Sequence, residues 1–198
     1  MSISGAGSSL TWATGRELHV GENGTGMLSV SGGATLSGMA GATNDNLVLG
    51  NASGNGTMLI SGPGTLVAFT GSLYDGNDGR GSVTIDAAGA TVTGRGFVGV
   101  AATGNGTLAV RNGGSLIIVG ANGGLDIGEA TSSVGVATID GPGTVLSVAA
   151  DHIRVAVNGS GTLSVLNGAT VTCGWKSSAA TFGRSIPISP KCWVRIEC

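Results

Sequence analysis

The chain has 198 residues, a formal net charge of −2 and a charged fraction of 10 %. This length suits a single domain. The charge argues against nucleic-acid binding, because no stretch clusters Lys or Arg with aromatic residues. No run of about 20 apolar residues occurs, so no helix is expected to cross a membrane. Aromatic residues make up 4 % of the chain, and we therefore expect an interior of stacked Leu, Val, Ile and Ala.

One short pattern, G-x-x-x-[VI], recurs along almost the whole chain. The β-branched residues that serve as anchors of the successive copies are Ile3, Val30, Ile60, Ile85, Val110, Ile139 and Val165. They lie 27, 30, 25, 25, 29 and 26 residues apart. A period of roughly 27 residues is typical of solenoids.

Each complete copy contains the pattern of a half-buried strand. Four residues before the anchor stands a glycine, at Gly26, Gly56, Gly81, Gly106, Gly135 and Gly161. Two residues before it stands an apolar residue, at Leu28, Met58, Val83, Leu108, Ala137 and Leu163. The residue between is mostly small or polar, and this alternation places the anchor and its apolar partner on one face of a strand.

Two further short strands are expected in each copy. A Gly-rich turn follows the anchor, and a Thr or Ser before an aliphatic residue then marks the second strand, at Thr35, Thr65, Thr91, Ser115, Thr144 and Thr170. A third apolar run occupies residues 18–21, 47–50, 97–100, 125–128 and 153–156. The pattern predicts an all-β fold, a right-handed single-stranded parallel β-helix of about seven coils with three strands each.

Two other repeat architectures do not fit this period. A propeller blade needs about 40 to 50 residues and four antiparallel strands. Collagen needs Gly at every third position, and the glycines here are not spaced in threes.

The N-terminal segment matches the interior of a repeat. Residues 3–10, ISGAGSSL, align with residues 30–36, VSGGATL, apart from one inserted residue. No basic stretch, apolar core and cleavage site of a secretory signal precede them. We therefore expect a repeat domain over residues 1–171 that opens in mid-repeat, as a fragment of a longer protein would.

Residues 172–198 differ from the repeats in composition. They contain only two of the 39 glycines but hold all the cysteines and lysines and two of the three tryptophans, namely Cys173, Cys192, Cys198, Lys176, Lys191, Trp175 and Trp193. We interpret this segment as either a C-terminal cap or attachment segment, or a non-native tail. The cysteines lack the paired short spacing of zinc knuckles, so no metal site is predicted.

Candidate acidic chemistry is sparse. Asp75, Asp78 and Asp86 fall in one coil with Arg80 between them, which suggests an acid or calcium cluster. One coil alone contributes, however, and Asp75 and Asp78 lie in or beside a Gly-rich turn that favours Asp for local hydrogen bonds. Asp126 does not fit the calcium-binding nonapeptide repeat. No catalytic, cofactor-binding or metal-ligating residue is predicted.

Two other features have simpler structural explanations. His19 and His152 fall in third-strand regions of the first and last complete coils, too far apart to cooperate, and each is expected to be a solvent-facing polar residue. A threonine column would form a ladder on one edge, which hydrogen-bonded stacking explains better than ice binding. Its members are Thr35, Thr65, Thr91, Thr144 and Thr170.

The repeat itself resembles a known family. The segments VGENGTGMLSVSGGATL at 20–36 and VAVNGSGTLSVLNGATV at 155–171 are similar to the repeat of bacterial autotransporter passengers and of PEP-CTERM-associated exported proteins. The resemblance covers residues 3–171. It implies a type V secretion passenger, held at the cell surface by a C-terminal β-barrel and serving as an adhesin or stalk. The chain lacks the signal peptide, barrel and sorting motif of that pattern.

Three hypotheses follow for function. The first is a non-enzymatic adhesive or structural module of an exported bacterial surface protein, a rigid rod that contacts host or surface glycans, matrix proteins, or adjacent repeats or the barrel of a longer parent protein. The second is a carbohydrate-active β-helix enzyme, a glycan lyase or hydrolase, which would need carboxylates and basic groups converging from neighbouring coils. The aligned columns show no such convergence. The third is a passive scaffold.

Overall fold

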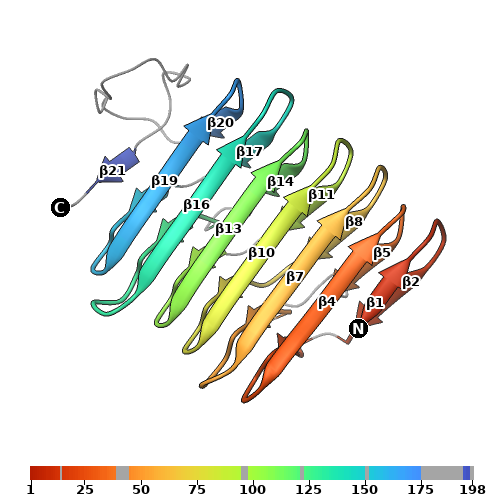
Figure 1. The fold of residues 1–198 in the computed structure, drawn as a ribbon, viewed down its shortest axis with the longest axis horizontal. Coiled ribbons are helices and arrows are strands. Elements are labelled where there is room, and N and C mark those ends of the chain that lie inside the picture. Colours follow the sequence, from red (N-terminus) through yellow and green to blue (C-terminus); the bar gives the residue numbers. More distant parts are fainter. Residues whose placement is uncertain are drawn as a thin grey trace.

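The computed structural model describes residues 1–13, 15–38, 45–94, 98–120, 123–149 and 152–174, with the backbone of residues 194–196. Every regular element in these residues is a β-strand, and the strands form three parallel sheets of seven strands each. The chain visits the three sheets in turn and then starts the next coil, so equivalent strands of successive coils lie side by side (Figure 1). The predicted parallel β-helix with three strands per coil is confirmed.

The three sheets differ in strand length. Sheet A consists of β1 (Ser2–Ser4), β4 (Thr25–Ser31), β7 (Asn55–Ser61), β10 (Arg80–Asp86), β13 (Asn105–Arg111), β16 (Val134–Asp140) and β19 (Ser160–Leu166). Sheet B consists of β2 (Ser9–Trp12), β5 (Thr35–Gly38), β8 (Leu66–Phe69), β11 (Thr91–Gly94), β14 (Ser115–Ile118), β17 (Val145–Val148) and β20 (Thr170–Cys173). Sheet C consists of β3 (Leu18–Val20), β6 (Leu47–Leu49), β9 (Leu73–Asp75), β12 (Val98–Val100), β15 (Leu125–Ile127), β18 (Ile153–Val155) and β21 (Val194–Ile196).

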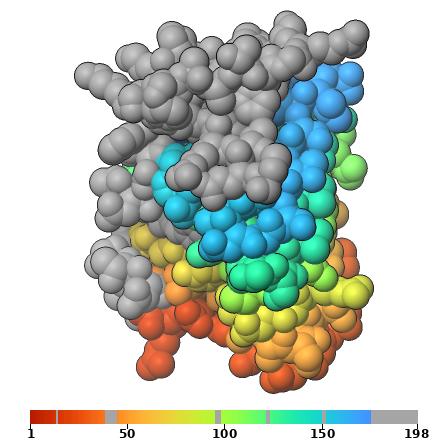
Figure 2. All heavy atoms as spheres, turned by 90° about the vertical axis from the view of Figure 1, so that its left-hand side faces the viewer, coloured from red at the N-terminus to blue at the C-terminus, as the bar shows by residue number. Residues whose placement is uncertain are grey.

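The coils stack into a rod with the two ends of the chain at opposite ends of the stack (Figure 1). In the space-filling view the coils follow one another as bands of colour from red to blue (Figure 2). Within the described residues no helix is long and apolar enough to cross a membrane.

The register of sheet A confirms the anchors. All seven anchors, from Ile3 to Val165, lie opposite one another in a single column. The glycine column and the apolar column that precede them are also in register. The anchors from Val30 to Ile139 are fully buried, so this column forms the inner wall of the rod.

Aromatic rings in the core lie over glycines of the next coil. Trp12 ends β2, and a Cβ added to Gly38 in the neighbouring strand would lie 3.0 Å from its ring. Phe69 ends β8, and a Cβ added to Gly94 would lie 2.5 Å from its ring. The narrow interior therefore accepts a large side chain only where the coil above it contributes none.

A corner without side chains connects sheet C to sheet A. At Gly106 a Cβ would lie 2.1 Å from the carbonyl oxygen of Asp75 and 2.3 Å from the amide nitrogen of Ala101. At Gly76, whose φ is +79°, a Cβ would lie 2.1 Å from the carbonyl oxygen of Asn105. Backbone of one coil thus packs directly on backbone of the next, which explains why the glycine column recurs.

The third-strand prediction missed one coil. Leu73–Asp75 forms β9 between β6 and β12, although no third strand was predicted there. Asp75 is the last residue of this strand and lies beside the Gly-rich turn at residues 76–79, as expected, but its side chain is buried. An aspartate at an inward position hides the apolar pattern on which the prediction depended.

The predicted threonine ladder is wrong at two positions. Thr35, Thr91 and Thr170 begin sheet-B strands, but Leu66 and Val145 occupy that column in the coils of Thr65 and Thr144. The Pro-containing turns are one residue longer than the turn before Thr35, so these two threonines lie one position earlier and are buried.

The two buried threonines connect coils through their hydroxyl groups. Thr65 Oγ1 donates to the carbonyl oxygen of Ser61 (2.8 Å) and accepts from the N–H of Gly33 in the preceding coil (3.0 Å). Thr144 repeats both bonds, to Asp140 and from Gly113, at the same distances. Each hydroxyl therefore satisfies backbone groups in two coils at once.

The predicted boundary at residue 171 falls inside β20, which continues to Cys173. The side chain of Cys173 is buried in an inward column of sheet B. Residues 194–196 form β21, which pairs with β18. The predictions on Trp175, Trp193, Lys176, Lys191, Cys192 and Cys198 lie outside the described residues.

The substitution Gly106→Ala tests the corner. We expect it to lower the free energy of unfolding by about 1–3 kcal/mol, the usual cost of forcing a carbon into filled space. Gly24→Ala is the matched control, because a Cβ there has nothing within 4 Å. Denaturant unfolding followed by circular dichroism checks this, and equal effects of the two substitutions would contradict the proposed close packing.

The substitution Thr65→Val tests the connecting hydroxyl. It leaves the N–H of Gly33 and the carbonyl of Ser61 without this partner, so we expect a loss of about 1–3 kcal/mol. Thr35→Val is the control, because Thr35 lies in an outward column and Val suits a strand. Thermal melts of both variants provide the measurement, and a Thr65→Val protein as stable as the control would refute the expectation.

Candidate functional site

Polar and charged side chains gather on sheet C. The middle residues of its strands form one column: His19, Val48, Tyr74, Gly99, Asp126 and Arg154. They alternate with the inward residues and so face outward. Two clusters of polar groups lie along this face, one in the first three coils and one in the last coils.

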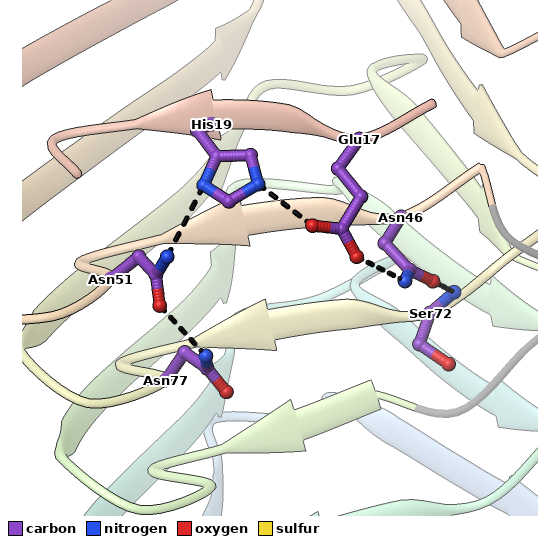
Figure 3. Close-up of polar contacts among 6 residues, drawn as sticks. All are labelled: Glu17, His19, Asn46, Asn51, Ser72 and Asn77. Atoms are coloured by element: carbon purple, nitrogen blue, oxygen red, sulfur yellow. Dashed lines mark hydrogen bonds and ion pairs between the residues drawn. The ribbon is translucent and has the colours of Figure 1, made fainter. Parts of the chain in front are cut away.

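The first cluster is a chain of hydrogen bonds between coils (Figure 3). His19 Nε2 lies 2.8 Å from Glu17 Oε2, and the side-chain amide of Asn51 lies 3.4 Å from His19 Nδ1. Asn77 then donates to Asn51 Oδ1 at 2.9 Å. On the other side, Asn46 donates to Glu17 Oε1 at 2.8 Å. The donor order fits a neutral imidazole that carries its proton on Nε2.

Hydrogen bonds set the ionisation of Glu17. The bond from Asn46 lowers the pKa of this carboxyl below its ordinary value, and the bond from His19 lowers it further. The carboxylate is therefore held in its charged form as an acceptor between two coils. This arrangement stabilises the stack and leaves Glu17 poorly suited to act as a proton donor.

A buried aspartate supports the same end of the rod. Asp45 is fully buried, and its Oδ1 accepts from the backbone N–H of Gly15 at 2.7 Å. Its Oδ2 accepts from the hydroxyl of Thr70 at 2.9 Å. Asp45 thus connects three successive coils with both oxygens satisfied.

The second cluster is an ion-pair group formed by Asp126, His152 and Arg154. Arg154 donates from Nε to Asp126 Oδ1 at 2.7 Å and from Nη2 to Asp126 Oδ2. His152 Nε2 lies 3.1 Å from Asp126 Oδ1. The Asp126 side chain is 0 % exposed, whereas those of Arg154 and His152 are 43 % and 28 % exposed. Two basic side chains of one coil therefore cover a buried carboxylate of the preceding coil.

The carboxyl groups of Asp126 and Glu129 have pKa values shifted in opposite directions. Burial acts to raise the pKa of Asp126, but hydrogen bonds from His152 and Arg154 together bring it below its ordinary value. Burial raises the pKa of Glu129, and the negative charge of Asp126 raises it further. A divergent pair of carboxyls beside a cation is an arrangement found in acid–base catalysis.

This convergence corrects the sequence analysis, which found no carboxylate and basic groups meeting from neighbouring coils. The missed signal was spacing: Asp126 and Arg154 are 28 residues apart, which is about one coil. However, the carboxylate of Asp126 is not accessible to solvent. Both oxygens of Asp126 are bound by Arg154 and none of its side chain is exposed, so a substrate cannot contact this carboxylate.

The structure separates Asp75, Asp78 and Asp86, which the sequence analysis placed in one coil. Asp75 is buried in β9, while Asp78 accepts from the hydroxyl of Thr103 in the following coil. Asp86 ends β10 and binds Arg111, with Nη2 of Arg111 2.8 Å from Oδ2. The proposed acid cluster therefore does not form.

The two histidines do not occupy equivalent positions, contrary to the alignment of third-strand regions. His19 lies in the middle of β3, and Arg154 occupies that column in β18, while His152 precedes β18. Each histidine is partly exposed and interacts with a carboxylate. They belong to separate clusters at the two ends of sheet C.

Within the part of the chain that the structure describes, no three His, Cys, Asp or Glu side chains come together in a way that would hold a metal ion.

Comparison of the chain with protein families, curated proteins and solved structures gives no match in any of the three.

The substitution Arg154→Met tests the role of the ion-pair group. It leaves the buried carboxylate of Asp126 without its main partner, and we expect a loss of about 3–5 kcal/mol in stability. Because the pKa of Asp126 is lowered, the stabilisation is present above the ordinary value of 3.8 and is lost as the pH falls further. Denaturant unfolding at pH 7 and pH 3 measures both effects.

Arg111→Met is the matched control for this prediction. Arg111 and Asp86 form an ion pair whose side chains are 51 % and 27 % exposed, and exposed pairs contribute about 0–1 kcal/mol. Equal losses in the two variants would contradict the assignment of Asp126 as a buried, compensated charge.

Proposed function

We propose that this protein is a non-enzymatic adhesive or structural module that acts as a rigid rod. The observation that carries the proposal is the outer face of sheet A. Thr57, Thr107 and Thr162 are exposed in one outward column, alternating with Ser82 and Val136. The column begins with the exposed Met27, and its later members are short, uncharged side chains that recur once per coil, at intervals of about 4.8 Å.

Such a face suits many weak contacts with a repetitive partner. Each short hydroxyl contributes little alone, but contacts held in one rigid array are made together and their effects combine. A rigid array also loses little conformational entropy on binding. Host or surface glycans and matrix proteins are the partners that we propose, since their repeating units match a repeating surface.

The resemblance of the repeats to autotransporter passengers and PEP-CTERM-associated proteins supports placing this rod at the cell surface or outside the cell. In this proposal the module belongs to an exported bacterial surface protein and stacks on adjacent repeats or a barrel of that protein. Contacts with host or surface partners would then occur along the outward faces of the rod.

A carbohydrate-active enzyme is the second candidate. The opposite pKa shifts of Asp126 and Glu129 beside Arg154 favour it. The complete burial of Asp126 disfavours it, because a carboxylate must contact the substrate to act as a base or nucleophile.

Binding of the full chain to a panel of glycans and matrix proteins tests the first candidate. We expect saturable binding that weakens at least tenfold when Thr57, Thr107 and Thr162 are all replaced by Lys, because three bulky charges interrupt the sheet-A face. The control replaces three exposed residues of the sheet-B column, Ser9, Leu66 and Thr170, by Lys. Circular dichroism establishes that each variant is folded.

The same panel separates the two candidates when it is also assayed for cleaved glycan. Cleavage that disappears in Glu129→Gln would support the enzyme and overturn the adhesive proposal. Binding that both triple variants lose equally would show that sheet A is not the contact face. A folded rod that binds no partner would favour a passive scaffold.

A further inference from the structure

An aspartate interrupts an aliphatic column inside the rod. The last residues of the sheet-C strands lie in register and face inward, and they are Val20, Leu49, Asp75, Val100, Ile127 and Val155. The aspartate is as buried as its neighbours, with 1 % of its surface exposed. Its position in the column would ordinarily be filled by Val, Leu or Ile.

Neither oxygen of this carboxyl group has a partner at ordinary hydrogen-bonding distance and angle, and the backbone N–H of Thr107 interacts with it only outside those limits. The group points toward β10 in sheet A, the next strand along the chain, where a Cβ on Gly81 would lie 2.2 Å from Oδ1. The absent side chain of Gly81 therefore makes room for the carboxyl. Since charged groups are rarely buried without a partner, the position itself is unfavourable for a carboxylate.

The surroundings of Asp75 supply no compensating charge. Its neighbours in the column are Leu49 and Val100, and the inward residues of β10 are Val83 and Ile85. The nearest titratable and charged groups in the chain, Tyr74, Asp78 and Arg80, lie on the outward side of β9, in the following turn and at the exposed start of β10.

Burial raises the pKa of Asp75 well above its ordinary value of 3.8, and the backbone N–H of Thr107 offsets only part of this effect. When the folded pKa is the higher one, the unfolded chain loses its proton first as the pH rises. Stability is therefore greatest below the ordinary value and falls as the pH rises from there toward the folded pKa. This dependence is opposite in sign to that of Glu17, Asp86 and Asp126, whose pKa values are lowered.

We propose that the carboxyl group of Asp75 stays protonated inside the folded rod and that this proton stabilises the third coil. The stacking of this coil on its neighbours then weakens as the pH rises. The aliphatic members of this column, from Val20 to Val155, pack by burial alone, which does not depend on pH. At Asp75 a proton decides how firmly the neighbouring coils pack. The inference concerns the rod itself and holds whether or not sheet A binds a partner.

The test compares the melting temperatures of the full chain, Asp75→Val and Asp75→Asn from pH 4 to pH 8. The Val variant restores the aliphatic column, and the Asn variant keeps the shape but cannot ionise. We expect the melting temperature of each variant, minus that of the unmodified chain, to increase by about 3 °C or more over this range. The Val variant is also expected to be more stable than the unmodified chain at pH 8.

Asp86→Asn is the matched control for the pH dependence. A hydrogen bond from Asn112 is the largest influence on Asp86 and lowers its pKa, so this variant loses relative stability as the pH rises toward 3.8, and its difference from the unmodified chain is nearly constant from pH 4 to pH 8. A difference for both Asp75 variants that is constant from pH 4 to pH 8 would overturn the proposal. So would an Asp75→Val protein that is less stable than the unmodified chain at every pH.

A second measurement keeps the proposal testable if the Asp75 variants do not fold. Carbon-13 labelling of the aspartate carboxyl groups in the unmodified full chain allows each group to be titrated by NMR. We expect the Asp75 resonance to titrate above its ordinary value of 3.8, at a higher pH than that of Asp86. An Asp75 resonance that titrates at or below its ordinary value would overturn the proposal.

Discussion

The corner between sheet C and sheet A is the constraint on which the other features of the rod depend. Here the backbone of one coil packs directly on the backbone of the next, so that a Cβ at Gly106 would overlap two main-chain atoms. Because no side chain fits, the path of the chain at this corner is the same in coil after coil. The strands that follow start in register, and the anchors from Ile3 to Val165 then fall into one column.

The stacking of coils requires most buried ionisable groups to have hydrogen-bond partners. Asp45 and Asp126 are fully buried, and each has both oxygens bound by groups of neighbouring coils. These contacts add directional bonds between coils to a core that is otherwise held by apolar burial. Asp75 is the exception, because it is equally buried and its oxygens have no such partners. The contribution of Asp75 to stability therefore depends on pH in the opposite sense from that of Asp126.

The distribution of charge also bears on function. On sheet C, Arg154 and His152 are engaged with Asp126, which makes that cluster a structural element of the stack. In sheet A the outward column from Thr57 to Thr162 carries short, uncharged side chains, and the charged Asp86, Arg111 and Asp140 lie at the ends of the strands. A surface of this kind offers repeated weak contacts, and the rigidity of the coils keeps those contacts in a fixed array. Asp126 is buried beneath its basic partners, whereas Thr57, Thr107 and Thr162 are exposed and uncharged. This contrast is the reason why we favour adhesion or scaffolding over catalysis.

The sequence by itself determined the fold class, the repeat and the inner wall, because a corner that excludes side chains requires Gly at a fixed position and the interior requires Val or Ile four residues later. Tertiary structure alone decided the register of the turns. Thr35 and Thr65 lie equally far from the preceding sheet-A strand, but the sheet-B strand starts at Thr35 in one coil and at Leu66 in the next. Thr65 therefore stays in the turn, and its hydroxyl lies in the core, where it bonds Gly33. Tertiary structure also decided which polar groups meet. Asp126 and Arg154 contact each other because their separation of 28 residues equals about one turn of the coil, and Asp75 is buried because β9 directs its last residue inward. The local sequence pattern predicts which residues can face the core. Contacts between coils, by contrast, depend on the exact length of every turn in the chain.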